Sequence, residues 1–311
     1  MTPSIAVALP FRPNDRPSAP THGVRSRTVN EEQSHGEEDS ARVLIVTPTY
    51  EEAPNIAELL RRIRGAVPGA DILVVDDASP DGTGAIAREV ASELSCIDVL
   101  QRDGKDGLGS AYRAGFGYGI ARGYDVLIQI DADLSHDAEV IPKLCALISG
   151  GADVAIGSRY ITGGSIPHWP WYRRVLSRYG NFYACFVLGL PIHDTTSGFR
   201  AYRASALESA HYETTRAKGY GFQIETAYRA SLAGTSVVEY PICFLDRIRG
   251  YSKMTWKIAA EELLLVTWWG IRDRLLTRIR KPDAANRQKQ VERRSMISQA
   301  ARLFRRHTVR P

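Results

Sequence analysis

Two carboxylates, Asp131 and Asp133, follow the apolar run YDVLIQI and are the side chains of this sequence best suited to chemistry. A charge is rarely left at the end of a buried strand unless a positive partner meets it. Aspartate oxygens are good ligands for Mg²⁺ or Mn²⁺, which also take oxygens from a substrate phosphate. On a strand, residues i and i+2 point to the same side, so both aspartates can face one ion. The alternative is that one aspartate caps a helix beginning at Ala138 and the other is solvated.

The segments around this pair alternate between short apolar runs and helical periods. We predict strands at 42–48, 71–77, 97–102, 124–133 and 152–159, and helices at 53–67, 85–94, 109–122 and 138–148. Apolar strands separated by helices indicate an α/β fold with a mostly parallel sheet that is flanked by helices on both faces.

Polar residues follow four of these strands, at 48–52, 76–77, 131–133 and 158–159. Ligands of such sheets bind at the carboxyl ends of the strands, so we expect one site along this edge. A dinucleotide site would need G-x-G-x-x-G after the first strand. The turn there reads TPTYEEAPN, without glycine, and the chain has no P-loop motif. A metal ion is therefore the expected group that balances the charge of a bound diphosphate.

Composition and charge limit the class of protein. The four cysteines form no CxxC pair, which argues against a zinc site or a disulfide framework and fits a reducing compartment. Residues 272–311 contain 13 Lys and Arg against 3 Asp and Glu, a local charge of +10 in a chain of +5. Such a basic tail suits anionic lipid or nucleic acid. Aromatic residues do not interleave with basic ones, so we expect no nucleic-acid partner.

The two ends of the chain differ from its centre. Residues 1–40 are rich in Pro, Ser and charge, and we expect a disordered extension. Residues 254–281 contain paired tryptophans followed by arginines, and we expect an amphipathic helix that lies in a membrane interface. Its glutamates argue against a membrane span. The alternative is a helix packed on the catalytic domain. Residues 282–311 are expected to form a basic mobile tail.

Seven motifs occur in order along the chain: VTPTYEEAPNI, VVDDASPDGT, GLGSAYRAGF, DADLSH, IGSRYITGGS, SGFRAYR and RIRGYSK. Together they resemble the inverting family 2 glycosyltransferases and, more narrowly, the dolichol- or polyprenol-phosphate mannose synthases. The resemblance implies a nucleotide-diphospho-sugar transferase (GT-A) fold, with a catalytic domain at 41–253. It also implies transfer of mannose from GDP-mannose to a polyprenyl monophosphate, with Mg²⁺ or Mn²⁺ as cofactor. We expect a cytoplasmic enzyme, peripheral at the inner face of the plasma membrane, and an integral-membrane partner protein is possible.

The resemblance also implies roles for single residues. The positions that match the family's donor-base pocket are Pro48, Tyr50, Glu52, Val75 and Asp77. Asp131, Ala132 and Asp133 match the segment along the nucleotide sugar, and the expected metal ligands are Asp131, Asp133 and Ser135. For Ser135, a place at a helix start is the alternative. The basic positions expected at donor phosphates are Arg159, Arg247 and Lys253, and those assigned to catalysis are Asp131, Asp133, Arg247 and Lys253.

The acceptor phosphate is expected to meet Arg159, Arg173 and Ser177, with Arg174 as a neighbouring candidate. Asp194 matches a recurrent family aspartate, either a loop cap or a catalytic group. His136 and His193 are interpreted as structural, because a phosphate monoester with a pKa of about 6 needs no strong base.

Two positions depart from the family pattern. Glu51 stands where Asn is common, and Ala78 stands where Gly or Asn is common. Two other functions remain open: a polyprenyl-phosphate glycosyltransferase that uses UDP-glucose or another UDP-sugar, and a non-catalytic nucleotide-sugar-binding protein. The intact acidic and basic motifs favour an enzyme.

Overall fold

The structure is a computed structural model that describes residues 41–217, 219, 221–246 and 256–277. The expected extension at 1–40 and the expected tail at 282–311 lie outside these residues. Arg247 and Lys253 lie outside them as well.

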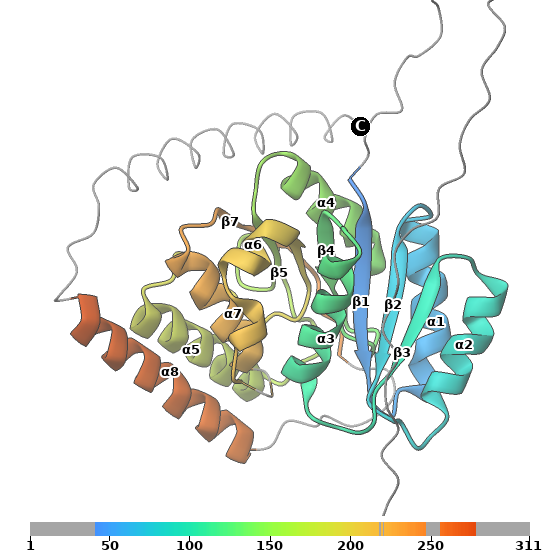
Figure 1. Ribbon diagram of the computed structural model, residues 1–311. Coiled ribbons are helices and arrows are strands. Elements are labelled where there is room, and N and C mark those ends of the chain that lie inside the picture. The colour runs from blue at the N-terminus through green and yellow to red at the C-terminus, as the bar shows by residue number, and fades with distance from the viewer. Residues whose placement is uncertain (1–40, 218, 220, 247–255, 278–311) are drawn as a thin grey trace, which may run out of the picture. The chain divides into compact units, whose positions relative to one another are not determined.

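Seven strands form one sheet in the order β3-β2-β1-β4-β6-β5-β7 (Figure 1). The strands are β1 (Val43–Thr49), β2 (Asp71–Asp76), β3 (Ile97–Gln101), β4 (Val126–Gln129), β5 (Val154–Ser158), β6 (Arg200–Arg203) and β7 (Val237–Pro241). All neighbouring pairs are parallel except those of β6, which runs antiparallel to β4 and to β5. The predicted α/β fold with a mostly parallel sheet is confirmed.

Helices cover both faces of the sheet. They are α1 (Ala53–Ala66), α2 (Thr83–Glu93), α3 (Leu108–Ala121), α4 (Ile141–Ser149), α5 (Trp171–Leu188), α6 (Ala204–Ser209), α7 (Gly221–Leu232) and α8 (Trp256–Thr277), with 3₁₀ turns η1 (Ala138–Val140) and η2 (Tyr212–Thr214). Side chains alternate along each strand, so Ile45 packs with α1, α2 and α4 while Leu44 and Val46 pack on the opposite face. None of the described helices is long and apolar enough to cross a membrane.

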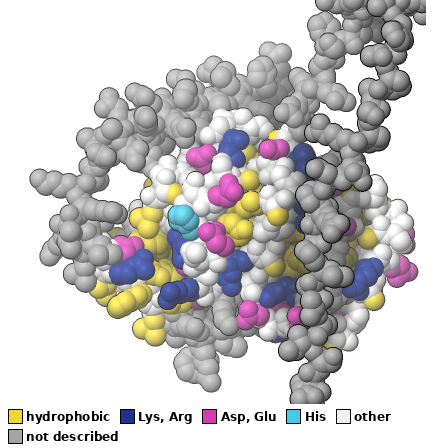
Figure 2. Space-filling view, in the orientation of Figure 1, with side chains coloured by type: hydrophobic (Ala, Val, Ile, Leu, Met, Phe, Trp, Pro, Cys, Tyr) yellow, Lys and Arg dark blue, Asp and Glu magenta, His cyan; other side chains and the backbone are white. Residues whose placement is uncertain are grey.

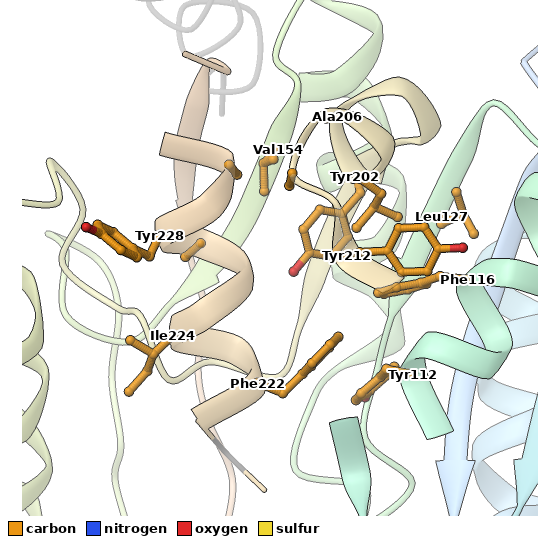
Figure 3. Close-up of a cluster of buried hydrophobic side chains, with 14 of the residues drawn as sticks. Tyr112, Phe116, Leu127, Val154, Tyr202, Ala206, Tyr212, Phe222, Ile224 and Tyr228 are labelled. Carbon is orange, nitrogen blue, oxygen red and sulfur yellow. The ribbon is translucent and has the colours of Figure 1, made fainter. Parts of the chain in front are cut away.

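The second face of the sheet holds the larger core, which is built around aromatic side chains of α3 and α7 (Figure 3). Tyr112 stacks on Phe222, and their ring centroids are 5.9 Å apart. The glycine-rich helix α3 lies close to the strands: a Cβ at Gly119 would lie 2.9 Å from Leu44 Cδ2. The glycines of this segment therefore serve close packing.

Candidate active site

The acidic pair lies in a turn, which corrects one prediction. We expected a strand to reach residue 133, but β4 ends at Gln129, where its pairing with Arg200 of β6 also ends. The chain then turns, and Leu134 has a left-handed φ of 60°. The alternation of side chains along a strand therefore does not explain why Asp131 and Asp133 are near one another. Neither aspartate is a helix cap, since Asp137 caps η1.

The Asp131 carboxylate lies between groups from two distant parts of the chain. Its Oδ1 accepts a hydrogen bond of 2.8 Å from the Tyr112 hydroxyl, and its side chain is 24% exposed. The backbone of Gly198 packs directly against the same carboxylate. Burial, and then the charge of Asp131, raises the pKa of Tyr112 well above its usual range, so Tyr112 remains a donor at neutral pH.

Asp133 is buried beside Ser135. The backbone N–H and the hydroxyl of Ser135 both donate to Asp133 Oδ1, over 3.1 and 2.5 Å. The Ser135 carbonyl accepts from the N–H of Leu245. Ser135 therefore orients the aspartate in this structure and does not begin a helix.

We expected His136 to be structural, and its ring does pack between Phe199 and Phe244. Neither ring nitrogen has a hydrogen-bond partner among the described residues, although Nε2 lies 3.8 Å from Asp131 Oδ2. A buried imidazole without a partner fits a site that a ligand completes.

The residues around the acidic pair fit a divalent cation of the hard, oxygen-binding type. Within the described part of the chain, no three His, Cys, Asp or Glu side chains are grouped closely enough to hold a metal ion by themselves. Mg²⁺ is usually bound through one or two carboxylates together with substrate phosphates and water, which is the arrangement that Asp131 and Asp133 can supply.

The carboxyl ends of β1 and β2 lie at the same edge of the sheet as the acidic pair. Asp77 is buried, and its carboxylate accepts a hydrogen bond of 2.7 Å from Arg102. Burial raises the pKa of Asp77 even though the charge of Arg102 acts in the opposite direction. The ring of Tyr50 faces the ammonium of Lys105, 4.0 Å from the ring centroid. Tyr50 and Asp77 therefore bring an aromatic face and a carboxylate to adjacent strands.

The other residues assigned to the base pocket have structural contacts. Pro48 and Val75 are paired in the β1–β2 ladder, and the Val75 side chain is buried in the core. Glu52 precedes α1, and its backbone N–H donates to Thr83 Oγ1. The Val75 side chain therefore belongs to the core.

Sequence reasoning missed the polar residues that join these two turns. Asp81 accepts hydrogen bonds from the N–H of Ala53 and from the hydroxyl of Thr83. Although burial raises it, these hydrogen bonds lower the pKa of Asp81. Glu51 and Ala78, the two departures from the family pattern, have left-handed φ angles of 56° and 54°. Asn and Gly adopt that conformation most easily, which accounts for the family preference.

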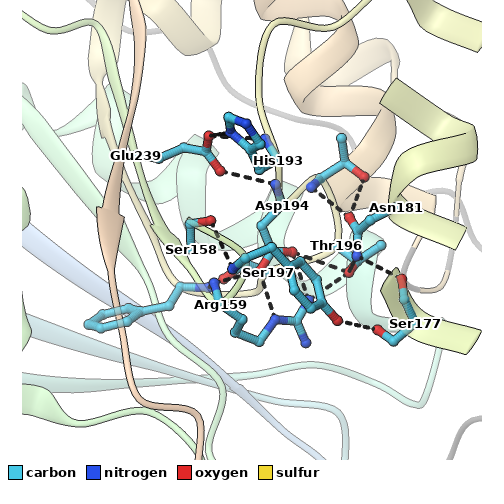
Figure 4. A network of polar contacts seen from close by, with 12 residues as sticks. Ser158, Arg159, Ser177, Asn181, His193, Asp194, Thr196, Ser197 and Glu239 are labelled. Carbon is cyan, nitrogen blue, oxygen red and sulfur yellow. Dashed lines mark hydrogen bonds and ion pairs between the residues drawn. The ribbon is translucent and has the colours of Figure 1, made fainter. Parts of the chain in front are cut away.

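Arg159 has an anionic partner that the sequence analysis did not assign (Figure 4). Its Nε and Nη2 donate to the two carboxylate oxygens of Asp194, both over 2.7 Å, and its backbone N–H donates to Oδ2 over 3.0 Å. Both residues are buried. Burial lowers the pKa of Arg159, but Asp194 outweighs this effect and raises it; Arg159 in turn lowers the pKa of Asp194. Asp194 is thus a structural anchor of the site.

Helix α5 connects to this network through its inner face. Ser177 Oγ accepts a hydrogen bond of 2.7 Å from the Tyr160 hydroxyl, and Asn181 binds Thr195 and Thr196 (Figure 4). Arg173 lies over the Trp169 ring and is 3.4 Å from Asp246. The predicted acceptor-phosphate residues Arg159, Arg173 and Ser177 therefore lie on two connected segments.

The outer face of α5 is apolar and exposed. Seven large side chains at helical spacing are between 44% and 74% exposed: Trp171, Tyr172, Val175, Leu176, Tyr179, Phe182 and Phe186. The adjacent helix α8 exposes Leu263, Leu264, Trp268 and Ile271. Figure 2 shows hydrophobic and basic side chains gathered where these helices lie in Figure 1. We call these eleven residues the apolar surface. The prediction placed such a surface on residues 254–281 alone.

Comparison with known proteins defines the class. Residues 44–210 match the model of glycosyl transferase family 2. The chain belongs to this family and is a glycosyltransferase, as the motifs predicted.

Several curated relatives are similar over most of their length. A polyprenol monophosphomannose synthase of Mycolicibacterium smegmatis is 47% identical over 250 residues, which cover 78% of this chain and 94% of the relative. An undecaprenyl-phosphate mannosyltransferase of Micrococcus luteus is 46% identical over 230 residues, 74% of this chain and 94% of the relative. A dolichol-phosphate mannosyltransferase of Pyrococcus furiosus is 38% identical, over 76% of this chain and 66% of the relative.

Solved structures confirm the expected GT-A fold. The mannosyltransferase PcManGT from Pyrobaculum calidifontis, in complex with GDP-Man and Mn²⁺, has a TM-score of 0.52 at 17% identity and covers 83% of this chain and 70% of its own. Glucosyl-3-phosphoglycerate synthase from Mycobacterium tuberculosis, with Mn²⁺ and UDP-glucose, has a TM-score of 0.53 at 19% identity and covers 79% and 81%. At these identities the likeness concerns the fold alone.

Proposed function

We propose that this glycosyltransferase transfers mannose from GDP-mannose to a polyprenyl monophosphate, with inversion, at the inner face of the plasma membrane. The observation that carries the proposal is the extent of the similarity: relatives named for mannosyl transfer to lipid phosphates match about three quarters of this chain, at up to 47% identity. Asp131 and Asp133 lie within the family match at 44–210.

The site residues have distinct parts in this proposal. Tyr50 would pack on the nucleobase, and Asp77 would accept from the N–H groups of guanine. Asp131 and Asp133, with Ser135, would hold Mg²⁺ or Mn²⁺, and the bound ion would neutralise charge on the departing diphosphate. Arg247 and Lys253, outside the described residues, are assigned to the donor phosphates.

The bond changes balance without a strong base. An oxygen of the acceptor phosphate forms a bond to the anomeric carbon as the bond from that carbon to the β-phosphate oxygen breaks, and GDP leaves with the electron pair. A phosphate monoester with a second pKa of about 6 is largely ionised at neutral pH. Arg159, Arg173 and Ser177 would position this phosphate, which is the main contribution expected of protein groups here.

The apolar surface would dock on the membrane that contains the lipid acceptor and so place the active site next to it. Helix α5 carries three arginines and no acidic residue beside its aromatic face, a composition that suits an anionic membrane interface. Its inner face contacts the segments that hold Arg159, so a lipid phosphate bound there would lie close to the bilayer.

Transfer to lipid tests the donor and the metal. Purified protein is mixed with vesicles that contain a polyprenyl monophosphate and with labelled GDP-mannose, UDP-glucose or UDP-GlcNAc, with and without EDTA. We expect label in the extracted lipid only from GDP-mannose, lost with EDTA and restored by Mn²⁺. Equal transfer from a UDP-sugar would overturn the donor assignment.

Matched variants test the acidic pair. Asp133→Asn should abolish transfer with little change in the melting temperature. Glu139→Gln makes the same change of charge at an exposed position nearby and should leave transfer unchanged. Full activity of Asp133→Asn would refute the metal assignment.

Vesicle sedimentation tests the apolar surface. Leu176→Glu should reduce binding to phosphatidylglycerol vesicles about tenfold or more, because a buried leucine contributes about 1.5–3 kcal/mol. Leu232→Glu, at an exposed leucine on α7, is the control. Both variants should keep wild-type transfer to a water-soluble short-chain prenyl phosphate. Unchanged vesicle binding by Leu176→Glu would contradict the docking of α5.

A further inference from the structure

The segment before β6 reaches the active edge because of the strand's direction. Parallel strands bring their carboxyl ends to this edge, whereas an antiparallel strand brings its amino end there. Arg200, the first residue of β6, is paired with Gln129, the last residue of β4. The residues just before Arg200 therefore lie beside the turn that carries Asp131.

Gly198 makes the closest approach to the acidic pair. A Cβ at this position would overlap Oδ2 of Asp131 and would lie only 2.9 Å from its Cγ and its Oδ1. Gly198 has no left-handed φ, so its backbone conformation would accept alanine. The space occupied by the Asp131 carboxylate is what requires glycine here.

Arg200 fixes the path of this segment. Its guanidinium is fully buried and donates to the backbone carbonyls of Ser197 over 2.8 Å, Thr195 over 2.5 Å and Gln223 over 2.8 Å. Hydrogen bonds from a charged donor are about twice as strong as neutral ones. Arg200, which follows Gly198, therefore connects the residues that precede Gly198 to α7.

The Tyr112 hydroxyl holds the carboxylate from the other side. Tyr112 is fully buried among the aromatic rings of the core, and its hydroxyl donates to Asp131 Oδ1 over 2.8 Å. The Asp131 carboxylate thus lies between the Tyr112 hydroxyl and the backbone of Gly198, with no room for a side chain at position 198.

We propose that Tyr112 and the segment Ser197–Arg200 are positioning elements for the Asp131 carboxylate, with Gly198 as the residue whose missing side chain sets where the carboxylate lies. This inference rests on the proposed metal role of Asp131. Residues that orient metal ligands typically contribute about 10–100-fold to metal affinity. We expect an added methyl group at position 198 to displace the carboxylate from its bond to Tyr112, because the three atoms nearest to that methyl group all belong to Asp131.

Metal affinity tests the inference apart from turnover. The Kd of Mn²⁺ in the presence of GDP is measured from the electron paramagnetic resonance signal of free Mn²⁺, for the full chain. We expect Gly198→Ala to raise this Kd by about tenfold or more. Gly65→Ala is the control, because a Cβ there meets no atom within 4 Å. Its Kd should equal that of the wild type.

Two further variants distinguish a failure of the positioning role of Gly198 from a failure of the proposed metal role of Asp131. Asp131→Asn should raise the Kd at least as much as Gly198→Ala; wild-type affinity in Asp131→Asn would show that the proposed metal role itself is wrong. If Asp131→Asn binds weakly but folded Gly198→Ala binds like the wild type, the positioning role is wrong and the proposed function stands. If Gly198→Ala does not fold, Tyr112→Phe decides: a raised Kd supports the inference, and an unchanged Kd overturns it.

Discussion

Replacing Asp194 with asparagine tests how strongly the buried ion pair with Arg159 stabilises the site. The substitution keeps the shape of the side chain and removes its charge. In the wild type the Asp194 carboxylate accepts three hydrogen bonds from Arg159. In the variant Arg159 stays buried, but this negative charge is gone. The remaining hydrogen bond of the guanidinium, to the Thr196 hydroxyl over 2.7 Å, supplies no negative charge.

The expected loss is large for a single substitution. Removing one partner of a buried ion pair costs about 3–5 kcal/mol, because the remaining charge stays desolvated. A domain of about 200 residues loses about 2–4 °C of melting temperature per kcal/mol. We therefore expect Asp194→Asn to lower the melting temperature by about 10 °C.

Urea unfolding gives the free energy directly, and an exposed ion pair supplies the control. Arg61 and Glu93 are 2.9 Å apart, with side chains that are 53% and 51% exposed. Glu93→Gln should lower the free energy of unfolding by less than about 1 kcal/mol. A loss below about 1 kcal/mol in Asp194→Asn as well would refute the argument that burial makes this pair important.

The same pair predicts the dependence on pH. Arg159 lowers the pKa of Asp194 in the folded state, below the value of about 3.9 for an unfolded chain. Its contribution is therefore complete above the unfolded pKa and is lost as the pH falls through the folded pKa. The difference in unfolding free energy between the wild type and Asp194→Asn should shrink below about pH 4. A difference that grows on acidification would contradict the sign of this shift.

Three other substitutions follow from local geometry. Ala78→Gly should raise the free energy of unfolding by about 0.5–1 kcal/mol in urea titrations, because Ala78 has a left-handed φ of 54°. Gly115→Ala should lower it by about 1–3 kcal/mol, because a Cβ there would lie 3.3 Å from Val75 Cγ2 and overlap Val46. Arg102→Leu should raise the pKa of Asp77 further, since the opposing charge is lost, and a carbon NMR titration of that carboxyl would show it.

Strands β1, β2, β4 and β5 were predictable because nearly all their residues are buried, whereas β3, of which only Ile97 is buried, was predicted from its position between two helical segments. Buried strands appear in the sequence as continuous apolar runs, and β1, β2, β3 and β5 lie within two residues of the predicted bounds. The fourth strand was predicted to continue to Asp133. Its apolar run does not show where the pairing with β6 ends, so the turn at Asp131 was not visible.

Strand β6 shows why the rest of the fold was harder to predict. Its sequence RAYR contains two arginines, and the charge conceals a buried strand. Arg200 is buried because distant backbone carbonyls satisfy its guanidinium, and no local pattern reveals them. The pairing of Arg159 with Asp194, 35 residues apart, is equally absent from the spacing. The aromatic residues of α5 were visible in the sequence, but we used only the positions of that helix that the family resemblance assigns to the acceptor phosphate.

Helix α5 lies between its exposed apolar side chains and the polar loops that contain Tyr160 and Thr195. Hydrogen bonds through Ser177 and Asn181 connect the helix to those loops. A rotation of the helix about its axis would therefore move the loops as well. An α-helix with its side chains is about 10–12 Å across. If α5 lies on a bilayer as proposed, a lipid phosphate would have to pass about one helix diameter to reach the loop of Arg159.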